Sequence, residues 1–145
     1  MSVPPDDTGS MSVFTVIFSV TVFLLAGLLV DGGAAINARL RASDIAEQAA
    51  RAAADQIDVE HLRATGNVRL LGDERAVCGK ARELVAAHRD AAVRLTRCAM
   101  GAAQGEVAVT VGVRWSAVFL GAFGFPGSEM SGAAAAGPDA GDQPP

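Results

Sequence analysis

The sequence predicts an α+β fold: a long N-terminal transmembrane helix continuing into an amphipathic helix, a second helix, and a small antiparallel sheet of two or three strands. Three patterns predict it: an uncharged apolar run near the N-terminus, helical periodicity behind the run, and a two-residue period towards the C-terminus. We divide the 145 residues into an N-terminal tail or short leader (1–10), a transmembrane helix (11–31), an α/β head that includes the continued helix (32–136), and a disordered tail (137–145).

The apolar run carries no charge from Thr8 to Val30. A helix of that length covers roughly 30 Å, the hydrocarbon thickness of a bilayer. A buried core helix would need a large domain around it, and the remaining Ala- and Gly-rich residues are too few. A cleaved secretory signal needs a basic start and an apolar core of about 7 to 15 residues, whereas this run is longer and follows Asp6 and Asp7. We therefore expect a retained span.

The charges behind the run bear on orientation. Arg39 and Arg41 are the only basic residues near either end, and the positive-inside rule would place the head in the cytoplasm. Asp31, Asp44 and Glu47 lie close by and weaken that argument. Asp31 stands at the far edge of the run, where we expect a residue in the headgroup layer rather than an intramembrane functional acid.

The continued helix is expected from Ala34 to about Ile57, in a stretch rich in helix formers and without proline. Glu47 and Arg51 form a favourable i,i+4 pair. One face is apolar and shallow, and it comprises Ile36, Leu40, Ile45, Ala49, Ala53 and Ile57.

Gly66 breaks this helical pattern within the head. Asp73 is a plausible N-cap of a second helix, whose apolar stripe comprises Val77, Ala81, Leu84, Val85 and His88. Alternation then predicts one strand from Val93 and a clearer one over 107–115. A third strand is expected over 128–136, after the apolar turn VFLGAFGF at 118–125.

The composition excludes several classes of function. The net charge is −4, with eleven arginines, the single Lys80 and no basic run, so no nucleic-acid partner is expected. No GxSxG, P-loop or GxGxxG motif occurs, and no nucleophile, base and orienter can be assembled. We therefore expect no enzyme activity, no catalytic residues, no cofactor and no small-molecule substrate.

Cys78 and Cys98 are the only cysteines. If the head is outside the cytoplasm, a disulfide closing a loop of about 20 residues would contribute on the order of 3 kcal/mol; otherwise two reduced thiols are expected. His61 and His88 bring the potential zinc ligands to four, but no pair has the CxxC or HxxxH spacing of structural sites, so no metal is expected. A packed, partly exposed His88 is also expected in preference to a Cys–His catalytic pair.

The boundary segments carry a resemblance to a known family. They read GSMSV at 9–13, LVDGG at 29–33 and NARLRASDIAEQAA at 37–50. The chain resembles TadE/TadG-like proteins of the tight-adherence (Tad, or Flp) pilus-assembly group, which are pilin-like minor subunits. The stretch 66–70 before a helix and a Val-rich strand also resembles actinobacterial members.

This resemblance implies a structural, single-pass protein of the cell membrane, with its N-terminus in the cytoplasm and its head outside. The implied partners are the lipid bilayer and other subunits of a pilus or secretion assembly. Ala26, Gly27, Gly32 and Gly33 would allow close helix packing, unless small residues are merely frequent throughout.

The resemblance also implies a leader cleaved between Gly9 and Ser10. Pilin-like subunits carry a Glu at the fifth mature position, where this chain has Phe14. Since some TadG-like members are thought to stay unprocessed, both outcomes remain open. The alternative function, suggested by Arg39 and Arg41, is a membrane-tethered binding or regulatory module with a cytoplasmic head.

Overall fold

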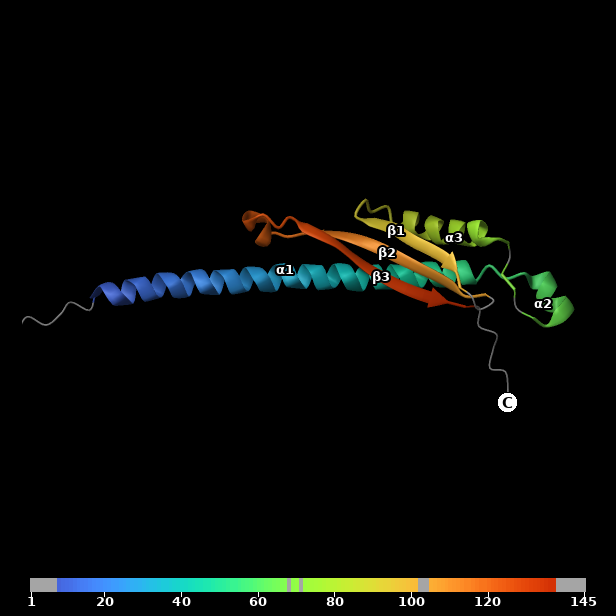
Figure 1. The fold of residues 1–145 in the computed structure, drawn as a ribbon, viewed down its shortest axis with the longest axis horizontal. Helices are drawn as coiled ribbons and strands as arrows, with labels where there is room; N and C mark the ends of the chain where they lie inside the picture. Colours follow the sequence, from blue (N-terminus) through green and yellow to red (C-terminus); the bar gives the residue numbers. More distant parts are fainter. Residues whose placement is uncertain (1–7, 68, 71, 102–104, 138–145) are drawn as a thin grey trace, which may run out of the picture. The chain divides into compact units, whose positions relative to one another are not determined.

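The computed structural model describes residues 8–67, 69–70, 72–101 and 105–137 (Figure 1). Residues 1–7 of the expected leader and 138–145 of the expected tail lie outside this range. The described chain divides into two compact units. One contains the residues up to Ala34 together with Ser116–Gly127, and the other contains Ala35–Trp115 and the residues from Ser128 onward.

The first unit is built on the N-terminal part of helix α1 (Thr8–Ala54). This helix is long and apolar enough to cross a membrane, with a mean hydropathy of 2.7 over its most apolar window. Only 6% of that window is buried, whereas the core helix of a soluble domain would be mostly covered. The hydroxyls of Thr15, Ser19 and Thr21 donate to carbonyls one turn back in α1, so these polar groups are satisfied within the helix.

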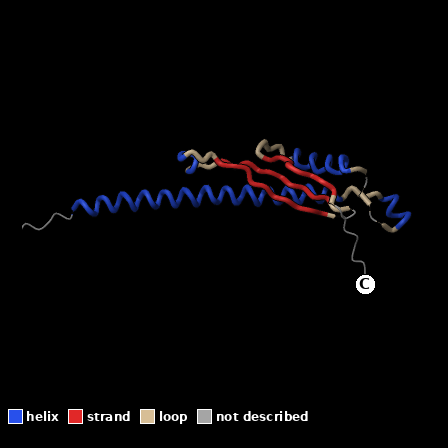
Figure 2. The backbone as a smooth tube through the Cα atoms, viewed as in Figure 1, coloured by secondary structure: helices blue, strands red, loops and turns tan. Residues whose placement is uncertain are grey.

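The second unit contains the sheet, whose strands β1 (Val93–Met100), β2 (Val107–Ser116) and β3 (Gly127–Ala136) lie in the order β1-β2-β3 (Figure 2). β1 and β2 pair antiparallel, with an irregularity between Leu95 and Arg97. The structure confirms the α+β class and all three expected strands.

The core of the second unit lies between the sheet and the alanine-rich face of α1. Alternate residues of β2 are buried, as the two-residue period predicts. The buried members are Val107, Val109, Val111 and Val113 from β2, and Ala38, Ala42, Ile45, Ala46, Ala49, Ala50, Ala53 and Ala54 from α1. Alanine leaves little side chain between helix and sheet, so the two backbones approach closely.

Helix α3 (Glu74–Ala87) adds Val77, Ala81 and Val85 to the same core and contacts β1. It begins at the predicted N-cap, since the Asp73 carboxylate accepts the N–H of Ala76 at 3.0 Å. The apolar stripe predicted for it is therefore confirmed except at its end. His88 is the exposed C-cap residue and does not pack in the core.

The connection between α1 and α3 differs from the expectation. α1 ends at Ala54, and Ile57 instead forms an isolated antiparallel bridge with Leu70. A short helix α2 (Val59–Thr65), not predicted separately, follows the N-cap Asp58 and ends at Gly66 in the left-handed conformation (φ 70°). The composition predicted a helix to about Ile57, whereas the bridge at Ile57 and the N-cap at Asp58 separate α1 from α2.

Candidate functional site

Two features of the described chain offer a surface or a chemistry beyond packing: the apolar half of α1 with the loop that follows β2, and the covalent link within the head. The side chains of α1 from Met11 to Val30 are mostly exposed. The largest exposed fractions among them are 79% at Leu29 and 73% at Met11 and Phe23. Phe14 is 65% exposed and its ring stacks on that of Phe18 at 6.0 Å. A helix with this surface needs an apolar environment.

Asp31 is the polar centre of the first unit. Its side chain is fully buried, and both carboxylate oxygens accept backbone N–H bonds from the start of the loop 116–127. Oδ1 accepts from Val118 at 2.8 Å, and Oδ2 accepts from Phe119 at 3.0 Å and from Leu120 at 2.6 Å. A carboxylate that accepts several N–H bonds is the way a buried charge is normally satisfied.

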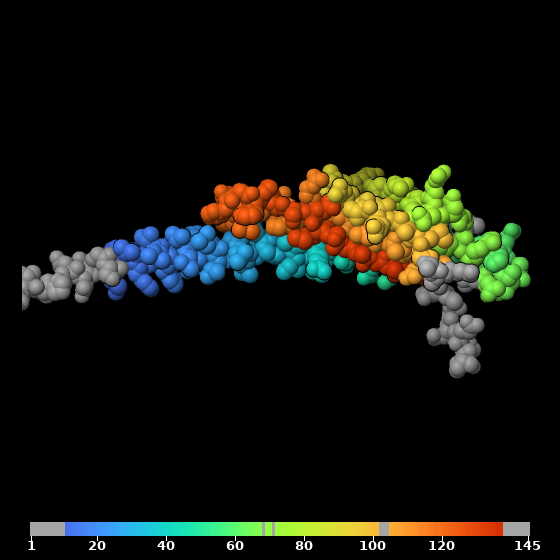
Figure 3. Space-filling model, viewed as in Figure 1, coloured from blue at the N-terminus to red at the C-terminus, as the bar shows by residue number. Residues whose placement is uncertain are grey.

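The loop 116–127 therefore folds around a residue that lies nearly ninety positions earlier in the chain. It contains a short 3₁₀-helix, η1 (Leu120–Phe123), which ends at Gly124 in the left-handed conformation (φ 91°). The space-filling view shows the orange residues of this loop lying against α1 (Figure 3). Gly27 makes that approach possible, since a Cβ there would lie 2.8 Å from the Cβ of Phe119.

The loop and α1 line an apolar pocket of about 330 Å³. Its lining residues are Phe23, Leu24, Gly27, Leu28, Phe119, Leu120 and Phe123. All the lining residues except Gly27 have apolar side chains, so the pocket suits hydrocarbon.

Sequence reasoning placed Asp31 in the headgroup layer and treated Gly27 as a possible helix-packing residue. The structure adds that Asp31 accepts the N–H groups of the loop, and that Phe119 occupies the space beside Gly27. The headgroup depth of Asp31 stays a prediction. A Cβ added at Gly32 or Gly33 would meet no atom of the described chain within 4 Å, so both positions are open to a neighbour. In the sequence, the bonds between Asp31 and the loop were signalled only by the position of Asp31, an acid at the edge of an apolar run.

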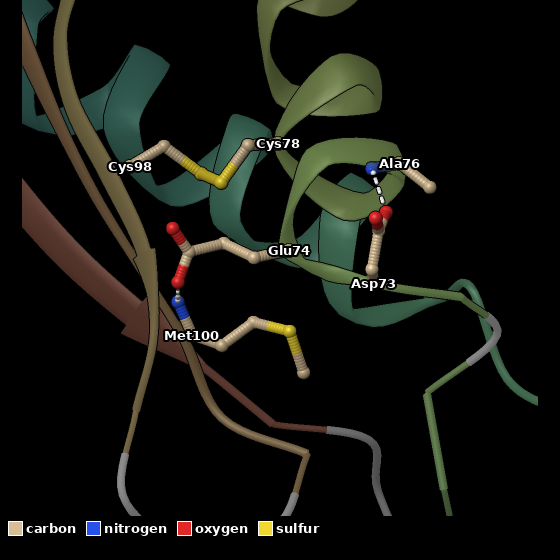
Figure 4. Close-up of a disulfide and its surroundings, with 6 residues drawn as sticks. All are labelled: Asp73, Glu74, Ala76, Cys78, Cys98 and Met100. Atoms are coloured by element: carbon tan, nitrogen blue, oxygen red, sulfur yellow. Dashed lines mark hydrogen bonds between the residues drawn. A yellow bond between two sulfur atoms is a disulfide. The ribbon is translucent and has the colours of Figure 1, made fainter.

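The head contains the disulfide between Cys78 in α3 and Cys98 in β1, with Cα atoms 5.8 Å apart (Figure 4). Beside it, the Glu74 carboxylate accepts the backbone N–H of Met100 at 3.3 Å. Both contacts join the first turns of α3 to the end of β1. The candidate pair from the sequence is thus brought together, as a structural link between two elements.

Ion pairs occupy several of the head's charged residues. Arg41 lies 2.8 Å from Asp90, and the N–H of Ala92 together with Arg41 holds the pKa of Asp90 below its usual value. The N–H of His61, followed by Arg69, likewise lowers the pKa of Asp58. Arg39 and Arg41 are the two arginines that bear on the orientation of the chain in the membrane. The positive charge of Arg41 is offset by the carboxylate of Asp90 in the head.

Within the ranges that the structure describes, no three or more His, Cys, Asp or Glu side chains are grouped as metal ligands. His61 lies in α2 and His88 at the end of α3, while both cysteines are in the disulfide. The four potential zinc ligands are therefore not brought together.

The leader residues Gly9 and Ser10 fall inside α1, which already begins at Thr8. Their side chains are outside the described part of the structure. The predicted cleavage between them stays a prediction.

Comparison with curated proteins gave no match, and neither did comparison with solved structures. A family model described as "Putative Flp pilus-assembly TadE/G-like" matches residues 9–56, about a third of the chain. This segment corresponds closely to α1 (Thr8–Ala54), the helix that carries the exposed apolar surface and Asp31. The resemblance noted from the boundary segments is thereby confirmed over one segment: residues 9–56 are similar to the TadE/G-like Flp pilus-assembly family.

Proposed function

We propose that the chain is a structural, non-enzymatic, single-pass membrane component of a Tad/Flp-type pilus or a related secretion assembly, with its head outside the cytoplasm. The match of residues 9–56 to the Flp pilus-assembly family carries this proposal. Its partners are the lipid bilayer and other subunits of the assembly.

The surface of α1 supports the membrane part of the proposal. The exposed apolar side chains from Met11 to Val30 would be unfavourable in water, at roughly 25 cal/mol per Å² of apolar area. Lipid covers such a surface, and so does the helix of a neighbouring subunit. At Gly32 and Gly33 an added Cβ would meet no other part of the described chain within 4 Å, so a neighbouring helix has room to approach there.

The disulfide supports the external position of the head, because disulfides persist outside the reducing cytoplasm. Arg39 and Arg41 favour the alternative, a membrane-tethered regulatory module with a cytoplasmic head. The pairing of Arg41 with Asp90 weakens that argument, since the two charges offset one another.

Labelling of intact cells separates the two topologies. Arg63→Cys places a thiol on the exposed surface of α2, and Ser2→Cys places one on the other side of the apolar run. With the native cysteines in their disulfide, we expect a membrane-impermeant maleimide to label Arg63→Cys in intact cells and Ser2→Cys only after the membrane is opened. The reverse pattern would establish the cytoplasmic head and reject the external one.

Assembly needs its own measurement. Cells lacking the chain should lose filaments or secreted assembly products from the sheared surface fraction, and the intact gene should restore them. Unchanged surface fractions would contradict a structural role.

Mass spectrometry of the purified chain reports processing: a mature protein starting at Ser10 supports cleavage after Gly9, and one starting at Met1 or Ser2 excludes it.

A further inference from the structure

The loop 116–127 has the composition of a membrane-contacting segment. The chain carries no charge between Arg114 and Glu129. Four large apolar side chains of the loop are exposed: Val118, Phe119, Phe123 and Phe125, by 72%, 43%, 66% and 67%. Apolar groups clustered in this way on a surface mark a site that something apolar covers.

The depth of the loop follows from its contacts with α1. It is anchored at Asp31 and reaches back along the helix to Phe23, which lines the shared pocket. Eight residues of helix correspond to roughly 12 Å, which is less than one leaflet of a hydrocarbon core of about 30 Å. If α1 spans from 11 to 31, the loop therefore lies beside the apolar run within a single leaflet.

The backbone of the loop is suited to that depth. Irregular chain is tolerated in hydrocarbon only where its N–H and C=O groups find partners within the protein. Asp31 accepts the N–H groups of Val118, Phe119 and Leu120. Carbonyls of the loop accept four more, those of Ala117, Ala122, Gly124 and Phe125, and Pro126 has no N–H to satisfy.

We infer that the loop 116–127 is a second membrane-inserted element. This apolar segment enters the leaflet beside the end of the α1 span and is covered by lipid acyl chains. The inference rests on the proposed membrane span of α1. Lipid is favoured over a protein partner because the exposed phenylalanines continue the exposed apolar surface of α1 within one compact unit. Asp31 is the residue that positions the loop, since it accepts the N–H groups of Val118, Phe119 and Leu120. Without an acceptor, these N–H groups would make insertion into hydrocarbon unfavourable.

Tryptophan fluorescence of the full chain in vesicles tests the inference. The background is Trp115→Phe, which removes the single native tryptophan. Phe123→Trp and Phe125→Trp report on the loop, Phe18→Trp on the α1 span, and Val59→Trp, half exposed on α2, on the head. Quenching is measured with phosphatidylcholine brominated on its acyl chains and, separately, with aqueous iodide.

We expect Phe123→Trp and Phe125→Trp to match Phe18→Trp, with strong quenching by the brominated chains and little by iodide, and Val59→Trp to show the opposite. If the loop tryptophans show the same quenching pattern as Val59→Trp, the inference is overturned while the membrane span of α1 still holds. Loop tryptophans quenched by neither agent would show a protein cover and reject lipid as the occupant. If Phe18→Trp itself is quenched by iodide, the membrane span of the proposed function fails as well.

A substitution of Asp31 tests the positioning role. Asp31→Asn keeps the shape of the side chain but replaces one acceptor oxygen with an N–H₂ donor. In the Phe123→Trp chain it should raise iodide quenching and lower quenching by brominated lipid, while Phe18→Trp with the same substitution stays unchanged. Identical loop quenching with and without Asp31→Asn would show that the carboxylate does not hold the loop in the bilayer.

Discussion

At the scale of single residues, Gly132 marks a close approach between β3 and α1. It is buried, and a Cβ at this position would clash with the backbone nitrogen of Ser43 and lie 2.5 Å from the carbonyl carbon of Ala42. Backbone atoms of a helix cannot move aside as the end of a side chain can. The alanine face of α1 and the absent side chain of Gly132 together set the distance between helix and sheet.

We predict that Gly132→Ala destabilises the head by at least about 1 to 3 kcal/mol, the usual cost of overpacking. Gly79→Ala is the matched control, because it lies inside α3 with open space around its Cβ position, and it should be neutral or stabilising by about 0.5 to 1 kcal/mol. Denaturant unfolding of the full chain in detergent measures both. Equal midpoints for the two variants would contradict the close approach.

Asp31 shows what a residue type can leave undecided. An acid at the end of an apolar run favours a headgroup position over an intramembrane functional group, but its residue type does not show which groups it binds. Its three N–H partners are 87 to 89 positions away, at a turn with no charge to suggest a partner. No local pattern reports a contact over that separation.

At the scale of elements, the disulfide ties α3 to β1 across a separation of 20 residues. Cys78→Ser/Cys98→Ser should lower the free energy of unfolding by about 3 kcal/mol, because the cross-link restricts the unfolded chain. Denaturant unfolding with and without reductant provides the measurement. Reduced wild type should match the double variant, and an unchanged midpoint after reduction would show that the link is dispensable.

Most elements follow from local periodicity. Asp73 and the stripe of Val77, Ala81 and Val85 specify α3, and alternating valines specify β2. The separate helix α2 and the 3₁₀-helix η1 were not predicted, because each is only about one or two turns long and is defined by contacts. Asp58 caps α2 while also binding Arg69, and η1 follows directly from the Asp31 contact.

At the scale of the whole molecule, the apolar run of α1 should determine membrane association. Val20→Arg/Leu24→Arg places two charges in the run, each costing about 2.5 to 3.5 kcal/mol near the centre of a spanning helix. Ile36→Arg/Leu40→Arg is the matched control, with residues 63% and 58% exposed beyond the run. After extraction of membranes with alkaline carbonate, the first variant should be lost from the membrane pellet and the control should stay in it. Equal retention of the two variants in the pellet would contradict a span over 11–31.

The sequence by itself determined the α+β class, the apolar helix, the three strands, the cysteine pair and the family resemblance, because each depends on local periodicity, composition or a short motif. The tertiary structure alone decided that Asp31 holds the loop 116–127 against α1 and that Arg41 pairs with Asp90. It also decided that Gly132 packs directly against the backbone of α1. These contacts join residues about 50 to 90 positions apart. They depend on how the chain folds back on itself, which no local pattern encodes.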